Sequence, residues 1–134
     1  MRRVRGWWFA VGGAAVLIAA TFTSLVRAAD VEKGKAVFEQ CAACHSLDGT
    51  GDYDGPTLKG IIGRRAGSLE DYRYSAAMKR SDVTWDAATL DTYVADPQAF
   101  IPGNRMAFAG ITEQAQRDDL IAYLTVATKD AKAN

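Results

Sequence analysis

The feature that most constrains this chain is a pair of cysteines followed directly by a histidine, in the order Cys41-Ala42-Ala43-Cys44-His45. A C-x-x-C-H sequence is the attachment signature of a c-type haem. Two residues between the cysteines bring both thiols to neighbouring vinyl groups of one porphyrin, and the adjacent histidine comes beneath the ring as an axial ligand of the iron. The motif therefore predicts one covalently bound haem c, with its iron, on Cys41, Cys44 and His45.

Two other interpretations of the cysteine pair are weaker in this sequence. A thioredoxin-like dithiol opens a helix after a strand in a βαβ unit, whereas no run of alternating apolar residues here predicts a series of strands. A structural zinc site takes four nitrogen or sulfur ligands. The chain has two cysteines and one histidine, which supply only three.

The first 28 residues have the layout of an export signal. Three arginines at positions 2, 3 and 5 precede an uncharged run over residues 7–26, and Val26-Arg27-Ala28 suits a signal peptidase. We predict that residues 1–28 are a signal peptide and that residues 29–134 form the mature domain in the periplasm. The alternative is an uncleaved anchor that holds the domain on the periplasmic side, because about 20 apolar residues suffice to span a bilayer.

The charge of the mature domain argues against nucleic acid as a partner. Residues 1–28 contain four of the 16 basic residues and no acidic residue, so 12 basic and 16 acidic residues are left, a net charge of −4. No basic stripe survives to neutralise phosphates. We expect one small domain, a monomer, and membrane contact only if the N-terminal segment is retained.

Two methionines of the mature domain are candidates for the second axial ligand. Met106 follows Pro102-Gly103, a pair that ends helices and makes turns, so its thioether can lie in a loop against the iron. Met78 lies in a short helical stretch and better suits a space-filling role beside the haem edge. A core methionine is the alternative for Met106, and lysine, tyrosine, the amino terminus and water are alternative ligands. Histidine/methionine ligation favours ferrous iron and fills both axial positions, which suits an electron carrier rather than an enzyme.

Apolar periodicity predicts an all-α fold. Asp30 caps a first helix that ends near Gln40. A second helix begins at Thr84 and ends near Asp96, where Pro97 stops it and a short turn follows. Thr112 caps the last helix, which ends near Thr128. The predicted apolar face of that last helix is Ala115, Leu120, Ile121 and Leu124.

Residues 46–73 form a long, glycine-rich segment with little predicted regular structure. A loop of this length is normally evidence against an assignment inside a compact domain. A bound haem removes the objection, because the loop can pack on the porphyrin. We therefore expect the apoprotein to be largely unfolded, with the haem as most of its core.

Taken in order, these motifs resemble the class I cytochromes c, mitochondrial-type and soluble bacterial. The segments that carry the resemblance are Asp30–Lys35, Cys41–His45, Gly55–Gly60, Gly63-Arg64, Trp85, Tyr93, Pro102–Phe108 and Asp119–Leu124. The resemblance implies a small, single-haem all-α fold with long haem-packing loops, in which the N- and C-terminal helices cross with Gly34 close to Tyr123. It also implies that the Pro56 carbonyl orients His45.

The resemblance implies further roles around the haem. Tyr93 would donate a hydrogen bond to the Met106 sulfur, and Phe108 would cover the exposed haem edge. The residues implied to hold the haem propionates are Arg64, Tyr74 and Trp85. The alternatives are that Trp85 and Tyr93 are core aromatics with a satisfied polar end and that Arg64 is a solvated surface charge.

These motifs together predict a single-electron carrier and not an enzyme. Its donor would be a quinol-oxidising complex or a dehydrogenase, and its acceptor a terminal oxidase, a reductase or a reaction centre. Gln40 and Gln98 stand where the mitochondrial members carry lysines around the haem edge, so we expect only a weak salt dependence of electron transfer. A small peroxidase would want a distal acid–base group such as histidine or arginine; the chain has no second histidine, although Arg105 is near Met106. A gas sensor would want an output domain.

Overall fold

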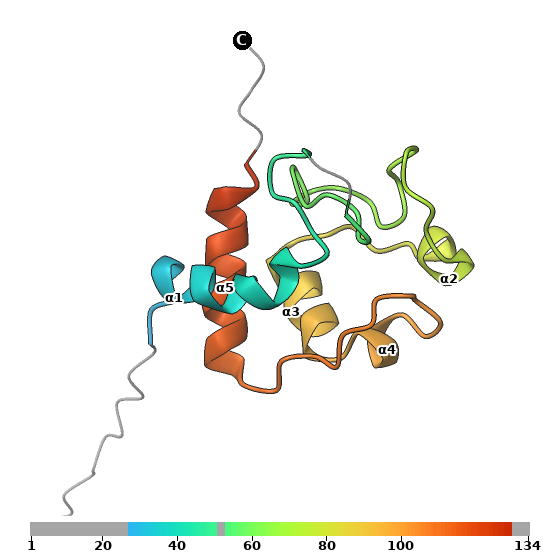
Figure 1. The fold of residues 1–134 in the computed structure, drawn as a ribbon. Coiled ribbons are helices and arrows are strands. Elements are labelled where there is room, and N and C mark those ends of the chain that lie inside the picture. The colour runs from blue at the N-terminus through green and yellow to red at the C-terminus, as the bar shows by residue number, and fades with distance from the viewer. Residues whose placement is uncertain (1–26, 51–52, 130–134) are drawn as a thin grey trace, which may run out of the picture.

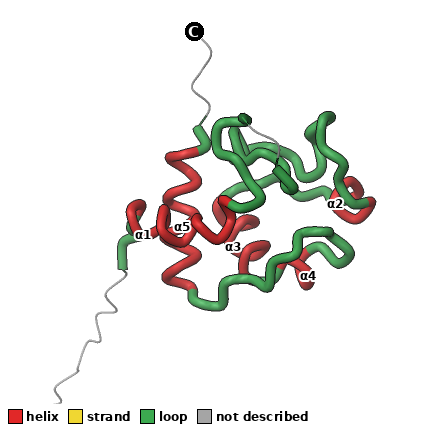
Figure 2. Tube along the Cα trace, viewed as in Figure 1, coloured by secondary structure: helices red, strands yellow, loops and turns green. Residues whose placement is uncertain are grey.

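The structure, a computed structural model, describes residues 27–50 and 53–129. Within these ranges it contains helices and loops and no strand, apart from one isolated bridge between Arg65 and Thr84. The helices are α1 (Val31–Ala42), α2 (Ala76–Arg80), α3 (Ala87–Ala95), α4 (Pro97–Phe100) and α5 (Gln114–Ala127). The prediction of an all-α fold is therefore confirmed (Figure 2).

The predicted signal peptide lies almost wholly outside the described residues, which include only Arg27 and Ala28 of it. Among the residues that the structure describes, no helix has the length and apolar character that a membrane span requires.

The first and last helices cross, as Figure 1 shows for α1 and α5. A Cβ atom at Gly34 would lie 1.9 Å from the backbone oxygen of Asp119 and 2.8 Å from the Cβ of Tyr123. Only glycine permits this approach, because real Cβ atoms do not come so close to a backbone atom. One turn later, the rings of Phe38 and Tyr123 pack with their centroids 5.6 Å apart. The predicted crossing is thus confirmed, and Gly34 lies at its closest point.

Helix α1 carries the cysteine–histidine motif at its C-terminal end. Asp30 caps it as predicted, accepting hydrogen bonds from two backbone N–H groups of the first turn. The helix ends at Ala42 instead of near Gln40, so Cys41 belongs to its last turn. The backbone N–H groups of Cys44 and His45 both donate to the Cys41 carbonyl, at 3.0 and 2.9 Å. This turn brings both cysteines and the histidine to one end of the helix.

Pro97 ends α3 but also begins a new helix, which the sequence did not predict. Asp86 and Thr89 form a capping box at the start of α3. After α3 ends, Pro97 occupies the first position of the one-turn helix α4, and the Asp96 carboxylate accepts a hydrogen bond from Ala99 N–H at 3.0 Å. Proline is tolerated at a first helical position, where its missing N–H would have no partner within the helix. The predicted turn after Pro97 therefore contains α4.

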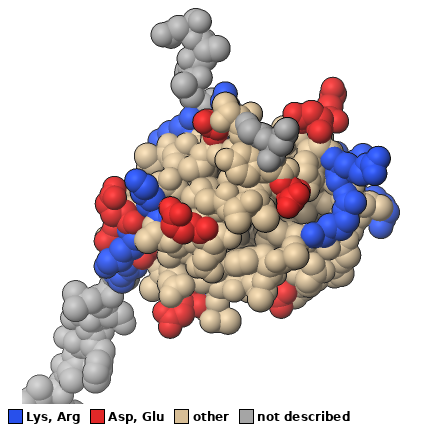
Figure 3. Space-filling view, viewed as in Figure 1, with Lys and Arg blue, Asp and Glu red and all other residues tan. Residues whose placement is uncertain are grey.

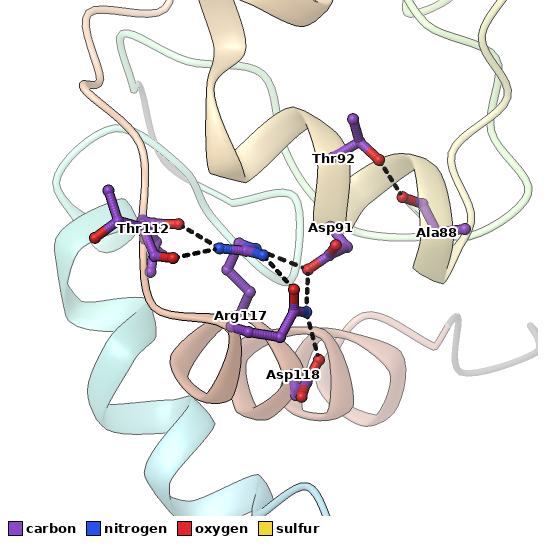
Figure 4. Close-up of polar contacts among 8 residues, drawn as sticks. Ala88, Asp91, Thr92, Thr112, Arg117 and Asp118 are labelled. Atoms are coloured by element: carbon purple, nitrogen blue, oxygen red, sulfur yellow. Dashed lines mark hydrogen bonds and ion pairs between the residues drawn. The ribbon is translucent and has the colours of Figure 1, made fainter.

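The predicted cap of the last helix was wrong. Helix α5 begins at Gln114, its N-cap is Glu113, and no side chain caps it. The Thr112 carbonyl instead accepts a hydrogen bond from the guanidinium of Arg117 at 2.9 Å (Figure 4). This bond holds the backbone that precedes α5, while no side chain caps the N–H groups of its first turn.

Arg117 joins α5 to α3 beneath the surface. Its residue is 8% exposed, its Nε donates to Asp91 at 2.8 Å, and its guanidinium also donates to the Ile111 carbonyl at 2.8 Å. A side chain that burial statistics assign to the surface thus occupies the interface. Ala115, predicted on the apolar face, is exposed, while the other three predicted residues of that face are buried.

The described residues of the long segment between α1 and α2, 43–50 and 53–75, form no helix, as predicted. It is tied to the rest of the chain by backbone hydrogen bonds from Gly60 to Thr128, from Gly63 to Trp85 and from Ala66 to Val83, at 2.7–2.8 Å. These hydrogen bonds hold the loop in place beside the α1–α5 pair in Figure 1.

Candidate haem site

All ten residues that the sequence predicts for the haem site line one cavity of about 350 Å³. They are Cys41, Cys44, His45, Pro56, Arg64, Tyr74, Trp85, Tyr93, Met106 and Phe108. The walls come from the end of α1, the long loop, α3, α5 and the segment between α4 and α5. Apolar side chains cover much of the lining: Leu58, Ile61, Leu90, Val94, Leu120 and Leu124.

The His45 imidazole is held by the loop that follows it. Its Nδ1 lies 2.7 Å from the Pro56 carbonyl oxygen. Because a carbonyl can only accept, Nδ1 carries the proton, and Nε2 of the neutral ring keeps a free lone pair. Burial lowers the pKa of His45; the Pro56 hydrogen bond opposes this shift, and the positive charge of Arg64 adds to it. Neutral imidazole with a free Nε2 is the form that binds a metal.

Gly55 permits the loop to approach the imidazole. A Cβ at this position would lie 2.6 Å from Cε1 of His45 and 2.6 Å from the Cys44 carbonyl oxygen. The Gly55 N–H donates to that same carbonyl at 2.8 Å. The glycine therefore sets the position of Pro56, and through it the orientation of the ring.

The Met106 backbone is fixed by Asn104, a residue whose role the sequence analysis missed. Asn104 is 6% exposed. Its Nδ2 donates to the carbonyls of Pro97 and Ile101 at 2.7 and 2.9 Å, and its Oδ1 accepts from Met106 N–H at 2.9 Å. The signal was present, because an asparagine between a Pro-Gly turn and a candidate ligand suits local side-chain-to-backbone bonding.

The Met106 sulfur is contacted by Tyr93 from α3. The Tyr93 hydroxyl donates to Sδ across 3.8 Å, as the resemblance implied. Burial raises the pKa of Tyr93 to about 12, so the hydroxyl keeps its proton and stays a donor at neutral pH. The Tyr93 ring also packs on Trp85, with centroids 4.9 Å apart.

Arg64, Tyr74 and Trp85 all reach the cavity, from two parts of the chain. The Arg64 guanidinium donates to the Thr57 carbonyl at 2.6 Å and to the Lys59 carbonyl at 2.9 Å. Trp85 is 6% exposed, so it belongs to the hydrophobic core as well as to the lining of the cavity. Burial raises the pKa of Tyr74, and the charge of Arg64 opposes the shift.

Tyr72 is a second lining residue that the sequence analysis did not select. Its ring meets that of Tyr74 edge to face at a centroid distance of 4.7 Å. Its hydroxyl donates to the Asp54 carbonyl at 2.8 Å. Two tyrosines two residues apart in a segment without helix signals could have been selected as a pair that faces one cavity.

The residues present fit a covalently attached haem. The cavity offers an imidazole nitrogen, a thioether sulfur and two thiols, with apolar walls for a porphyrin and Arg64 with tyrosine hydroxyls for its charged edge. Cys44 is exposed and Cys41 is half-buried. Burial, with a contribution from Cys44, raises the pKa of the Cys41 thiol to about 11. In the described part of the chain, no cluster of three or more His, Cys, Asp or Glu residues is arranged to hold a metal ion.

Comparisons with known proteins find similar sequences over most of the described chain. A family model described as "Cytochrome c" matches residues 31–127. A cytochrome c2 from Rhodoplanes tepidamans is 46% identical over 104 residues, which cover 77% of this chain and 97% of the relative. A cytochrome c-550 from Nitrobacter winogradskyi is 44% identical over 104 residues, which cover 77% of this chain and 95% of the relative.

A solved structure shares the arrangement of the helices. The cytochrome cH from Methylobacterium extorquens superposes with a TM-score of 0.67 and is 43% identical, over 72% of this chain and 97% of that one.

Proposed function

The chain belongs to the cytochrome c family and is a haem-containing electron carrier, and we propose that His45 and Met106 are the axial ligands of its haem iron. The haem is of the c type and is attached through Cys41 and Cys44. Once bound, it supplies the one-electron couple of its iron. The chain itself supplies the ligands, an apolar enclosure and an edge for exchange with partners.

One observation carries the ligand assignment. His45 and Met106 line the same cavity, and each is held by a hydrogen bond at the atom that tunes it as a ligand. Pro56 accepts from Nδ1 of His45, which leaves Nε2 for iron, and Tyr93 donates to Sδ of Met106. Outer partners of this kind orient a ligand and adjust its basicity.

The other lining residues have proposed roles at the propionates and at the exposed edge of the haem. Arg64, Tyr74 and Trp85 are proposed to hold the propionates, because all three line the cavity and each side chain carries a hydrogen-bond donor. Phe108 is half-buried at the cavity, and we assign to it the cover of the haem edge. An iron with two protein ligands offers no open position to a substrate, which supports a carrier role over an enzymatic one.

We place this carrier in the periplasm, exported by the signal peptide predicted for residues 1–28. Its donor would be a quinol-oxidising complex or a dehydrogenase, and its acceptor a terminal oxidase, a reductase or a reaction centre. Figure 3 shows Lys and Arg side chains gathered on the side of the molecule where α2 lies, and the last turn of α2 carries Lys79 and Arg80. Acidic side chains also appear on this face, so the expected steering of a partner is weak.

The deciding experiment is the far-red absorption of the ferric holoprotein, where a weak band reports methionine sulfur bound to iron. Met106→Leu should abolish the band. Met78→Leu is the matched control, because Met78 lines the same cavity and its replacement should leave the band unchanged. A band that survives Met106→Leu, or is missing from the unaltered protein, would contradict the ligand assignment without affecting haem attachment.

A further inference from the structure

The carboxylate of Asp119 is almost buried at the crossing of α1 and α5. Its side chain is 5% exposed. The Arg27 guanidinium donates to both of its oxygens, with Nη1 at 2.9 Å from Oδ1 and Nη2 at 2.7 Å from Oδ2. The backbone N–H of Asp30 donates to Oδ1 at 2.7 Å. Asp119 therefore holds the start of the folded domain by two contacts, one cationic and one neutral.

The predicted processing site removes the cationic contact. Cleavage after Ala28 would release Arg27 with the signal peptide and keep Asp30. A buried carboxylate that loses its counter-ion keeps its desolvation cost without the compensating attraction. The same cleavage creates one new cation, the α-ammonium group of Ala29, next in the chain to the N–H that already binds Asp119.

We propose that Asp119 is a binding site for the mature chain's own α-ammonium group, which replaces the Arg27 guanidinium after export; this inference rests on the proposed cleavage after Ala28. The geometry is close to that required. Ala29 and Arg27 line the same shallow hollow against α3 and α5. Because the amide nitrogen of Asp30 lies 2.7 Å from Oδ1, the nitrogen one residue earlier reaches the same carboxylate by rotation about the backbone of Ala29.

The other charges near this carboxylate do not take over the role of Arg27. On α1, the Nζ of Lys33 pairs with the Asp30 carboxylate at 3.5 Å. On α5, Asp118 is acidic and accepts from Gln114 at 2.8 Å. On α3, Asp91 is acidic and is bound to Arg117 at 2.8 Å. The Arg27 hydrogen bond now holds the pKa of Asp119 below its usual value, and the α-ammonium group would act in the same direction.

The test begins with the holoprotein produced by export of the full chain. Its intact mass should equal residues 29–134 plus one haem. Reductive ¹³C-methylation of the amines then permits the α-amine to be titrated by NMR, with the lysines as internal references. We expect the pKa of the α-amine to exceed its usual value of about 7.7–8.0 by about one unit or more, since an opposite charge lies in direct contact.

Variants assign that shift to one carboxylate. Asp119→Asn should return the α-amine to its usual pKa, whereas Asp118→Asn, the neighbouring acidic residue, should not. If Asp119→Asn fails to fold, the comparison is made between the folded and the urea-unfolded unaltered protein, whose α-amine should titrate lower when unfolded. If the chain begins at Ala29 and the pKa of its α-amine has its usual value, the proposed ion pair with Asp119 is wrong, although the predicted cleavage is correct. If the intact mass shows that the chain still contains Arg27, the proposed replacement of the Arg27 guanidinium by the α-ammonium group is wrong. Neither result affects the far-red test of the iron ligands.

Discussion

The two sides of this molecule are stabilised in different ways. On one side, α1 crosses α5 and α5 lies against α3, with side chains that bury one another. On the other side, the loop between α1 and α2 forms one wall of the cavity. Of the buried hydrophobic residues, this loop contributes Ile61 and Ala66, while α1, α3 and α5 contribute most of the rest. The helices bury side chains against one another as well as toward the cavity, whereas the loop has few buried hydrophobic residues and packs on a group that the chain must acquire.

Polar groups show the same division. The helical side buries charged groups with their partners, as in the network of Arg117, Asp91 and Gln114 (Figure 4). The loop side directs Arg64 and Tyr74 toward the cavity. A buried network specifies one arrangement of helices, whereas Arg64 and Tyr74 line the cavity in which a haem would lie.

The largest effect is expected from removal of the haem. Replacement of Cys41 and Cys44 by serine prevents covalent attachment and takes away the surface on which the loops pack. We expect the cooperative thermal transition to disappear and amide exchange in residues 53–75 to approach the unfolded rate. Residual protection should be confined to α1 and α5. Protected loop amides in this variant would show that the loop side does not need the haem.

The next effect tests the helical side at its tightest point. Gly34→Val places a branched side chain where even a Cβ would lie 1.9 Å from the backbone oxygen of Asp119. We expect a loss of about 3 kcal/mol or more in the free energy of unfolding, measured by denaturant titration of the holoprotein. Ala36→Val on the exposed face of α1 is the control and should cost about 0.6 kcal/mol, the helix propensity of valine alone. Equal losses would mean that the crossing is not close-packed.

A smaller effect is expected from the buried ion pair. Arg117→Met removes the cationic partner of Asp91 and the side-chain donor to the carbonyls of Ile111 and Thr112. We expect the free energy of unfolding to fall by about 2–4 kcal/mol, because one partner of a largely desolvated pair is removed. The control is Arg65→Met. Its partner Asp82 has a side chain that is 96% exposed, so that change should cost below about 1 kcal/mol. Similar losses in both variants would refute the distinction between buried and surface pairs.

The sequence predicted those parts of the fold and site that rest on local chemistry. The motif at Cys41–His45, the Asp30 cap and the interruption at Pro97 each have a short-range physical cause. The role of Asn104 was missed although its signal is local, since its carbonyl partners Pro97 and Ile101 lie seven and three residues earlier. The role of Arg117 was missed because its carboxylate partner, Asp91, lies on another helix 26 residues away. The error at Thr112 is one residue: Glu113 occupies the N-cap position, and Thr112 bonds through its carbonyl to the Arg117 guanidinium. Helix propensity indicates where a helix can begin, and tertiary packing determines where it does begin.

The smallest effect is expected at the junction of the two sides, where Tyr93 of α3 reaches the Met106 sulfur. Tyr93→Phe keeps the ring that packs on Trp85 and removes the hydroxyl that donates to Sδ. A hydrogen bond to the thioether withdraws electron density that ferric iron needs, so its loss should lower the reduction potential. Stability should change by about 1 kcal/mol or less, and the far-red band should persist. Tyr72→Phe is the control, since its hydroxyl bonds to Asp54, and its potential should change less. Equal potentials for Tyr93→Phe and the unaltered protein would show that the helical side holds the ligand loop without tuning the iron.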